Sequence, residues 1–251
     1  MASSTGSFPR LRPPLPEARG GFRRHARAGL VLGALFSTFT GLAALPDYWR
    51  EALNKFTAEV PPGWAYTQTT VRDDESTTER FDPARPPAEQ WTLQRHNGRP
   101  PTADELAKYV KFKAASAPPL AQAPFQKSDI DPGSVELVRE DADRAEFSCS
   151  FRAESAGSDK MLGHLRLILT VRKQPAFVEI FRLELRAPYS PVLGVKMNEL
   201  SVQMSFTPPG PDRPSLPAES SSLFAGRIFF VPTAENLRVA FSDFARVPPA
   251  W

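Results

Sequence analysis

Histidine and cysteine, which most often serve as bases, nucleophiles or metal ligands near neutral pH, are scarce in this chain. It has three histidines and one cysteine among 251 residues. His25 lies in a basic N-terminal stretch, His96 in a turn-like His-Asn-Gly sequence, and His164 at the start of a predicted strand. We therefore expect His96 to be an exposed turn residue and His164 a polar strand-edge residue. No familiar set of zinc ligands can be drawn from these residues, and we expect no metal site.

Cys149 lies between Phe147 and Phe151 on the apolar side of a predicted strand. This position favours a small buried side chain over a nucleophile. Because a single cysteine cannot form an intramolecular disulfide, the fold must depend on its hydrophobic core.

Two acidic clusters could in principle bind a cation or act in acid–base chemistry. One is Asp73-Asp74-Glu75, and the other comprises Glu140, Asp141 and Asp143. Each lies between two predicted strands, where such residues commonly form solvated turns. The nucleophile-elbow, zinc-protease and glycine-rich phosphate-binding motifs are all absent from the sequence. We therefore expect no catalytic residue and no cofactor.

The N-terminal 46 residues have the layout of a secretory signal peptide. A basic block with Arg19, Arg23, Arg24 and Arg27 precedes the uncharged stretch 28–45, and Pro46 follows small residues. We expect export to the periplasm; retention of residues 1–46 as an N-terminal anchor is the alternative. The first 27 residues contain six arginines and one glutamate, so the overall charge of +3 leaves −2 for the rest. The remaining chain has no basic excess, and we expect no nucleic-acid partner.

Two short helices are predicted in the remaining domain, residues 47–251. The first begins at Asp47, with an apolar stripe at Trp49, Ala52, Leu53 and Phe56. A capping box, Thr102 to Glu105, opens the second, which runs to about Ala114. Its predicted inward residues are Leu106, Tyr109 and Val110.

Period-two alternation dominates the sequence after residue 134 and predicts antiparallel strands with one apolar face. We expect a hairpin at Lys173-Gln174-Pro175 and a bulge near Asn198–Glu199. Proline-rich residues 116–133 and 207–221 predict long loops. The alternating segments are 145–151, 165–171, 181–186, 200–206 and 237–242.

Two aromatic-rich regions leave the nature of the interior open. Residues 223–231, LFAGRIFFV, place large apolar side chains on both faces of a predicted strand, with Phe229 and Phe230 pointing oppositely. Such a strand is either covered on both faces or faces an apolar cavity. A second cluster either lines a cavity mouth or closes the core. Its members are Trp64, Tyr66, Phe81 and Trp91.

Several of these residues also carry a family resemblance. A spaced pattern between residues 81 and 109 resembles one found in exported bacterial proteins of the LolA/LolB/RseB-like group. It consists of Phe81-Asp82-Pro83, Trp91-Thr92-Leu93, residues 97–102, Glu105-Leu106 and Tyr109. Residues 226–230 and 241–244 are similar to the closing hairpin of that group. The resemblance covers roughly residues 47–247 and rests on structural motifs; it assigns no ligand-binding residue.

The resemblance implies an α+β fold: a strongly curved antiparallel β-sheet, an incomplete barrel, with helices packed on its concave side. It also implies a non-catalytic periplasmic protein that binds an acyl chain, lipid or lipoprotein in the half-barrel. An envelope protein-interaction or stress-sensing module without a ligand is the alternative. An exported enzyme is the third hypothesis and has no supporting motif. Membrane contact is expected only through the N-terminal segment or transiently.

Overall fold

The computed structural model describes residues 45–115, 125–156 and 161–248. Nearly all of the predicted signal or anchor segment, residues 1–46, therefore lies outside the described residues. In the part of the chain that is described, no helix combines the length and apolarity needed to cross a bilayer. The helices and strands are α1 (Asp47–Lys55), β1 (Trp64–Arg72), β2 (Glu75–Phe81), β3 (Trp91–His96), α2 (Ala103–Ala115), β4 (Glu136–Glu140), β5 (Arg144–Cys149), β6 (Leu165–Lys173), β7 (Ala176–Leu185), β8 (Val195–Phe206), β9 (Pro217–Ile228) and β10 (Val231–Arg246).

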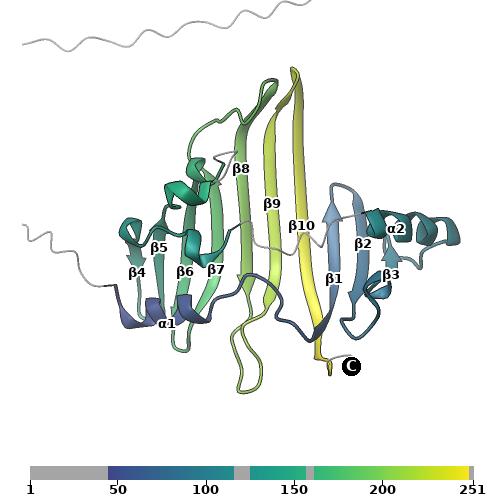
Figure 1. Ribbon diagram of the computed structural model, residues 1–251, viewed down its shortest axis with the longest axis horizontal. Helices are drawn as coiled ribbons and strands as arrows, with labels where there is room; N and C mark the ends of the chain where they lie inside the picture. The colour runs from purple at the N-terminus through teal and green to yellow at the C-terminus, as the bar shows by residue number, and fades with distance from the viewer. Residues whose placement is uncertain (1–44, 116–124, 157–160, 249–251) are drawn as a thin grey trace, which may run out of the picture. The chain divides into compact units, whose positions relative to one another are not determined.

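The ten strands form one antiparallel sheet in the order β3-β2-β1-β10-β9-β8-β7-β6-β5-β4 (Figure 1). The N-terminal strand β1 pairs with the C-terminal strand β10, which joins the two ends of the chain in the middle of the sheet. β3 and β4 remain as edges, so the sheet is not closed into a barrel. In chain order, α2 lies between these two edge strands. The α+β class and the open antiparallel sheet are as predicted.

Strand register defines the two faces of the sheet, because directly opposite residues in antiparallel strands share a face. One row crosses all ten strands, and we call the face that carries it the inner face. It is apolar at the β4 end and polar at the β3 end. The row is Leu137, Phe147, Leu169, Phe181, Met204, Ser220, Val239, Thr70, Thr77 and His96.

α1 covers the apolar end of the inner face, where it contacts β6 and β7. Trp49 and Ala52 are buried, and Leu53 and Phe56 pack against the same core, so the predicted stripe is confirmed. The indole of Trp49 lies 4.3 Å from the ring of Phe147, measured between centroids. Helix formation therefore follows from this packing more than from the cap, since Pro46 makes no side-chain capping bond.

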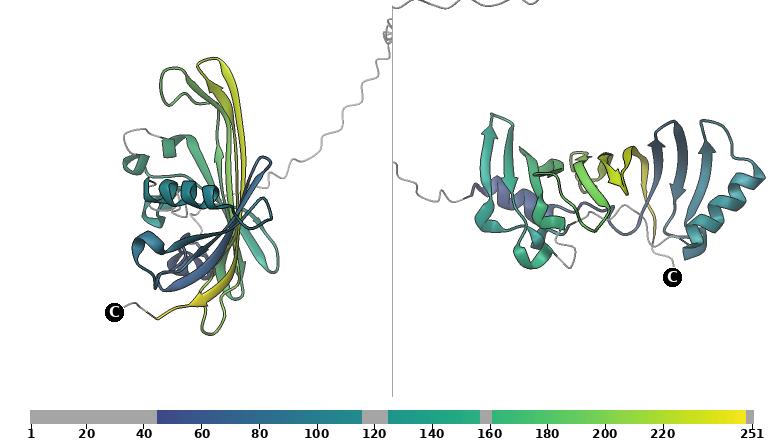
Figure 2. Two further views of the ribbon diagram at one scale, coloured as in Figure 1. Left: turned by 90° about the vertical axis from the view of Figure 1, so that its right-hand side faces the viewer. Right: turned by 90° about the horizontal axis from the view of Figure 1, so that it is seen from above.

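α2 lies against the polar end of the inner face beside β3, on the same side of the sheet as α1 (Figure 2). The capping box is confirmed: Glu105 N–H donates to Thr102 Oγ1, and Thr102 N–H donates to the Glu105 carboxylate at 2.7 Å. The inward positions of Leu106 and Val110 were wrongly predicted, since both side chains are exposed. The residues that face the sheet are Glu105, Tyr109 and Lys113, because β2 and β3 offer charged partners there.

The short-range features of the strand region are confirmed. β6 and β7 meet at the 173–176 hairpin, and the register of β8 against β9 shifts between Met197 and Glu199, where the bulge was predicted. The loop predicted at 207–221 is shorter than expected, because Pro217–Ile228 is strand β9. Pro217 occupies the first position of that strand, one of the places where a strand tolerates proline.

Residues 223–231 are not one two-faced strand, and this prediction was wrong. Ile228 ends β9, Val231 begins β10, and these two residues pair across a two-residue turn made by Phe229 and Phe230. The aromatic pair is exposed at the end of the hairpin and lines no interior.

Candidate ligand-binding face

The inner face continues between the two helix-covered ends, over β8, β9, β10 and β1. α1 contacts β6 and β7, and α2 contacts β3. Six inner-face side chains there are large, apolar and only half-buried, and on β10 their outer-face neighbours Arg238, Ala240 and Ser242 are exposed. The half-buried apolar set is Leu200, Val202, Phe224, Leu237, Val239 and Phe241.

Leu200 and Val202 also pack against the main core, so this surface is continuous with the interior beneath α1. Ser220 and Ser222 lie beside them on β9 and supply hydroxyl groups. On the β1 side the surface is bordered by polar side chains, Gln68 and Thr70, and by the ion pair between Arg72 and Glu235. A contiguous apolar surface with a few polar groups is the composition typical of binding sites for apolar ligands. We call this surface the central inner face.

An aromatic cluster borders the central inner face at the β1–β3 end. Tyr66 is buried, and its ring contacts those of Phe81, Trp91, Phe241 and Phe244 with centroid separations between 5.2 and 5.9 Å. Burial, helped by the charge of Glu79, raises the pKa of Tyr66 to about 12. Three of the four predicted cluster members are thus in one packed group.

Trp64, the fourth predicted member, sits at the start of β1 opposite Arg246. The cluster therefore closes a second, smaller core next to α2. Phe241 belongs both to this core and to the central inner face, which makes the cluster one wall of that surface.

Beneath α2 lies a buried ion pair. The carboxylate of Glu79 accepts from Lys113 Nζ at 2.8 Å, and the same ammonium lies 4.2 Å from the centre of the Trp91 ring. Glu79 is 6% exposed, so its charge depends on Lys113 for compensation. Desolvation, together with the Glu79 carboxylate, raises the pKa of Tyr109 well above its usual range.

His96 was wrongly predicted to be an exposed turn residue. It is the last residue of β3, and its side chain is 19% exposed between two carboxylates. Nε2 lies 2.7 Å from Glu75 Oε1, and Nδ1 lies 2.6 Å from Glu105 Oε1. These bonds raise the pKa of His96, the contact with Glu75 having the larger effect. The Asn97-Gly98 turn that follows was correctly recognised, with both residues in the left-handed region.

The His96 cluster predicts a pH-dependent contribution to stability. Arg99 donates two bonds to Glu105, and with the Thr102 N–H and His96 it holds the pKa of that carboxyl well below its usual range. Glu105 therefore stays ionised while His96 titrates. A raised folded-state pKa makes the histidine stabilising below its unfolded pKa of about 6.5, and this contribution is lost as pH rises through the folded pKa.

We expect His96→Gln to lower the thermal midpoint most at about pH 6 and to have little effect at about pH 9. Thermal unfolding followed by circular dichroism across this range measures the difference. His164→Gln is the matched control, since that ring stacks on Tyr189 at 3.7 Å instead of facing two carboxylates. A difference between wild type and His96→Gln that is constant with pH would contradict the charged role.

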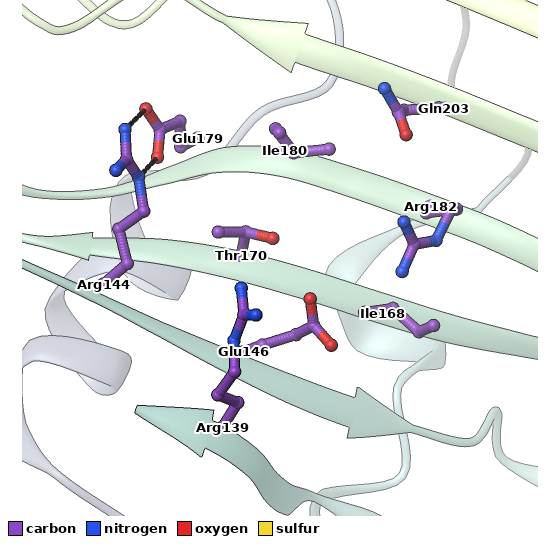
Figure 3. A pocket seen from close by; sticks show the side chains of 9 residues that line it. All are labelled: Arg139, Arg144, Glu146, Ile168, Thr170, Glu179, Ile180, Arg182 and Gln203. Atoms are coloured by element: carbon purple, nitrogen blue, oxygen red, sulfur yellow. Dashed lines mark hydrogen bonds and ion pairs between the residues drawn. The ribbon is translucent and has the colours of Figure 1, made fainter. Parts of the chain in front are cut away.

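The outer face of β4–β8 carries a polar depression of about 330 Å³ (Figure 3). Arg144 donates two hydrogen bonds to the Glu179 carboxylate, at 2.5 and 3.0 Å, and Arg172 donates a third at 3.1 Å. The bonds from Arg144, with those from Arg172, lower the pKa of Glu179. A carboxylate held ionised by two guanidinium groups is not poised to act as a general acid or base. The remaining lining residues are Arg139, Glu146, Ile168, Thr170, Ile180, Arg182 and Gln203.

The other residues that could have carried chemistry occupy structural positions. Cys149 is buried, and desolvation raises the pKa of its thiol to about 12. Asp141 accepts bonds from the N–H groups of Asp143 and Arg144 and forms the predicted β4–β5 turn. Asp73 and Asp74 make the β1–β2 turn as predicted, whereas Glu75 begins β2 and binds His96.

Comparisons with known proteins return no family. No family model matches the chain, and no curated protein matches it. A search of solved structures returns a dehydratase domain described as "GphF DH1 P1711L, L1744P variant: An isomerase-inactive variant of GphF DH1". The match has 10% identity, covers 80% of each chain and has a TM-score of 0.15.

Proposed function

We propose that this chain is an exported, non-catalytic periplasmic protein that binds an apolar ligand on the central inner face. The ligand class is an acyl chain, carried by a lipid or a lipoprotein, as the LolA-like resemblance implies. We further propose that the inner face is the concave side of a strongly curved sheet, with α1 and α2 at its two ends.

The observation that carries this proposal is the set of half-buried apolar side chains on β8–β10. Large apolar residues on an antiparallel strand are ordinarily matched by a second layer that removes them from water. Among residues 45–115, 125–156 and 161–248, the helices lie mainly against other strands, α1 against β6 and β7 and α2 against β3. A linear hydrocarbon lying across β8–β10 would supply that second layer, and Ser220 and Ser222 would accommodate a polar group of the same ligand.

A charge placed on the central inner face is expected to abolish this binding. Val239→Asp puts a carboxylate amid the apolar set, and we expect at least a tenfold rise in the Kd for cis-parinaric acid, measured by its fluorescence. Ala240→Asp is the matched control, because the neighbouring residue on β10 carries the same charge on the outer face. Equal affinities for both variants, or no binding by the wild type, would overturn the proposal.

A protein-interaction module remains the second candidate, favoured by the exposed side of α2. Leu106 and Val110 are one helical turn apart, and Val110 is 62% exposed, as a docking surface for a partner requires. Crosslinking in intact cells with wild type and the Leu106→Ser/Val110→Ser variant distinguishes the two. A single partner lost in that variant, together with no binding of cis-parinaric acid, would favour this function over a carrier.

A further inference from the structure

Strands β8, β9 and β10 project beyond strands β7 and β1 as a three-stranded finger. β7 pairs with β8 only from Ser201 onward, and β1 pairs with β10 only from Leu237 onward. Along the finger itself, the segment that leads into β8 pairs with it at one bridge, between Tyr189 and Met197. The finger, in the upper part of Figure 1, comprises residues 195–200, 223–228 and 231–236. Six residues of strand give the finger a length of about 20 Å.

The end of the finger is formed by large apolar side chains that water surrounds. Phe230 is 94% exposed and Leu193, in the segment that enters β8, is 97% exposed. Phe229, Val231 and Val192 are each more than half exposed. Large apolar side chains that cluster at a projecting end and are this exposed indicate a surface that binds a membrane or another molecule. We call these five residues the finger tip.

The backbone of the finger tip adopts a conformation that is unfavourable for phenylalanine. Phe229 and Phe230 have φ angles of 46° and 76°, the left-handed region that bulky side chains avoid. Two-residue hairpin turns of this kind favour Asn-Gly instead. The Phe229 N–H donates to the Gly194 carbonyl at 2.7 Å, and a Cβ on Gly194 would approach the Phe229 ring to 2.7 Å. Phenylalanine is thus present where stability alone favours other residues.

Two unneutralised cations lie directly behind the finger tip. Lys196 and Arg227 are opposite each other in the register of β8 and β9, an arrangement of like charges that destabilises a sheet. Within the described ranges neither forms an ion pair. On β10 of the finger, Glu235 is engaged by Arg72 at 3.1 Å.

We propose that the finger tip inserts into the interface of an anionic lipid bilayer. Such an interface has two layers, the acyl chains and the anionic headgroups above them. The exposed phenylalanine and leucine side chains of the finger tip match the acyl chains, and the basic side chains behind them match the headgroups. A protruding end suits a deformable lipid surface better than a pocket on a protein. The inference goes beyond ligand binding, since it assigns a membrane contact to the folded domain itself.

The first test separates membrane binding from stability. The full chain and its Phe229→Asn/Phe230→Gly variant are mixed with vesicles of phosphatidylcholine and phosphatidylglycerol and separated by flotation. Asn-Gly suits the turn, so we expect an unchanged or higher thermal midpoint, while the partition coefficient falls about tenfold for each phenylalanine removed. Phe112→Gln, an exposed phenylalanine on α2, is the matched control and is expected to bind as wild type.

The charge requirement is measured in the same assay. Lys196→Gln/Arg227→Gln is expected to lower binding to the anionic vesicles about fivefold for each charge removed. It is expected to leave binding to pure phosphatidylcholine vesicles unchanged. A variant that binds anionic vesicles as tightly as wild type would overturn the assignment of the two cations.

The second test locates the contact and excludes binding through residues 28–45. A fluorescent probe on Val231→Cys reports the finger tip, and the same probe on Ala240→Cys reports β10 about 30 Å away. The native thiol, Cys149, is buried and does not compete for the label. With brominated lipids we expect quenching at position 231 and none at 240.

A chain held on vesicles only by residues 28–45 would leave both probes unquenched, which would overturn the proposal. So would a vesicle-independent dimer in sedimentation that the Asn-Gly variant abolishes, because the tip would then be covered by a second copy.

Discussion

Replacing Phe181 with alanine is expected to lower the free energy of unfolding by about 3–5 kcal/mol. Phe181 is fully buried at the centre of the inner-face row on β7. Its ring contacts Phe56 at the end of α1, Phe125 in the segment that precedes β4, and Phe206 on β8, with centroids 5.4 to 6.3 Å apart. Truncation would therefore leave a cavity that three separate parts of the chain would have to close.

Urea denaturation followed by tryptophan fluorescence measures this loss, with the m-value as the check that both chains unfold in the same way. Val138→Ala is the matched control on β4. Its side chain is mostly exposed, and we expect its effect to stay below about 0.5 kcal/mol. A loss below 1 kcal/mol for Phe181→Ala would contradict its place at the centre of the core.

The strands near Phe181 could be predicted from sequence because one physical rule decides both their pattern and their burial. In β5, Ala145, Phe147 and Cys149 are buried while Glu146 and Ser148 are not, as alternation requires of a sheet with one covered face. The β8 bulge followed from the same phase argument, and the 173–176 hairpin from the short connection between two alternating segments. Chain order then leaves few ways to arrange a meander, although the joining of β1 to β10 has no local signal.

The finger tip could not be predicted, because its local sequence favours another structure. Ile228-Phe229-Phe230-Val231 has high β-propensity and contains neither of the residues that mark a two-residue turn. The register of β9 against β10, which continues to the pair Ile228–Val231, and the pairing of β9 with β8 up to Ile228 place the turn on the two phenylalanines. A local preference that is overruled at a solvent-exposed position indicates selection for something other than stability.

The orientation of α2 was predicted only in part, for a different reason. Apolar spacing selected Leu106, Tyr109 and Val110 as inward residues; Tyr109 does face the sheet, but beside it lie Glu105 and Lys113. Those three are also spaced four residues apart, so both sets satisfy helical periodicity. What decides between them is the charge of Glu79 and the position of His96 on neighbouring strands, which hydrophobic pattern does not contain.

This polar contact predicts a large effect for Lys113→Met. The substitution keeps the length of the side chain and its helix propensity but leaves the Glu79 carboxylate buried without its cation. We expect the free energy of unfolding to fall by about 3 kcal/mol, measured by urea denaturation. Lys111→Met, on the exposed side of the same helix, is the matched control and is expected to change stability by less than about 0.5 kcal/mol.

The double variant Glu79→Met/Lys113→Met distinguishes the loss of a partner from the loss of packing. Removing both charges leaves no buried ion to compensate, and the thioether introduced at position 113 can take the place of the ammonium over the Trp91 ring. We expect the double variant to regain most of the stability lost in Lys113→Met, giving a strongly non-additive cycle. Additive effects would mean that Glu79 reaches water without Lys113, and that α2 is held to β2 and β3 chiefly through the Glu105–His96–Arg99 contacts at its other end.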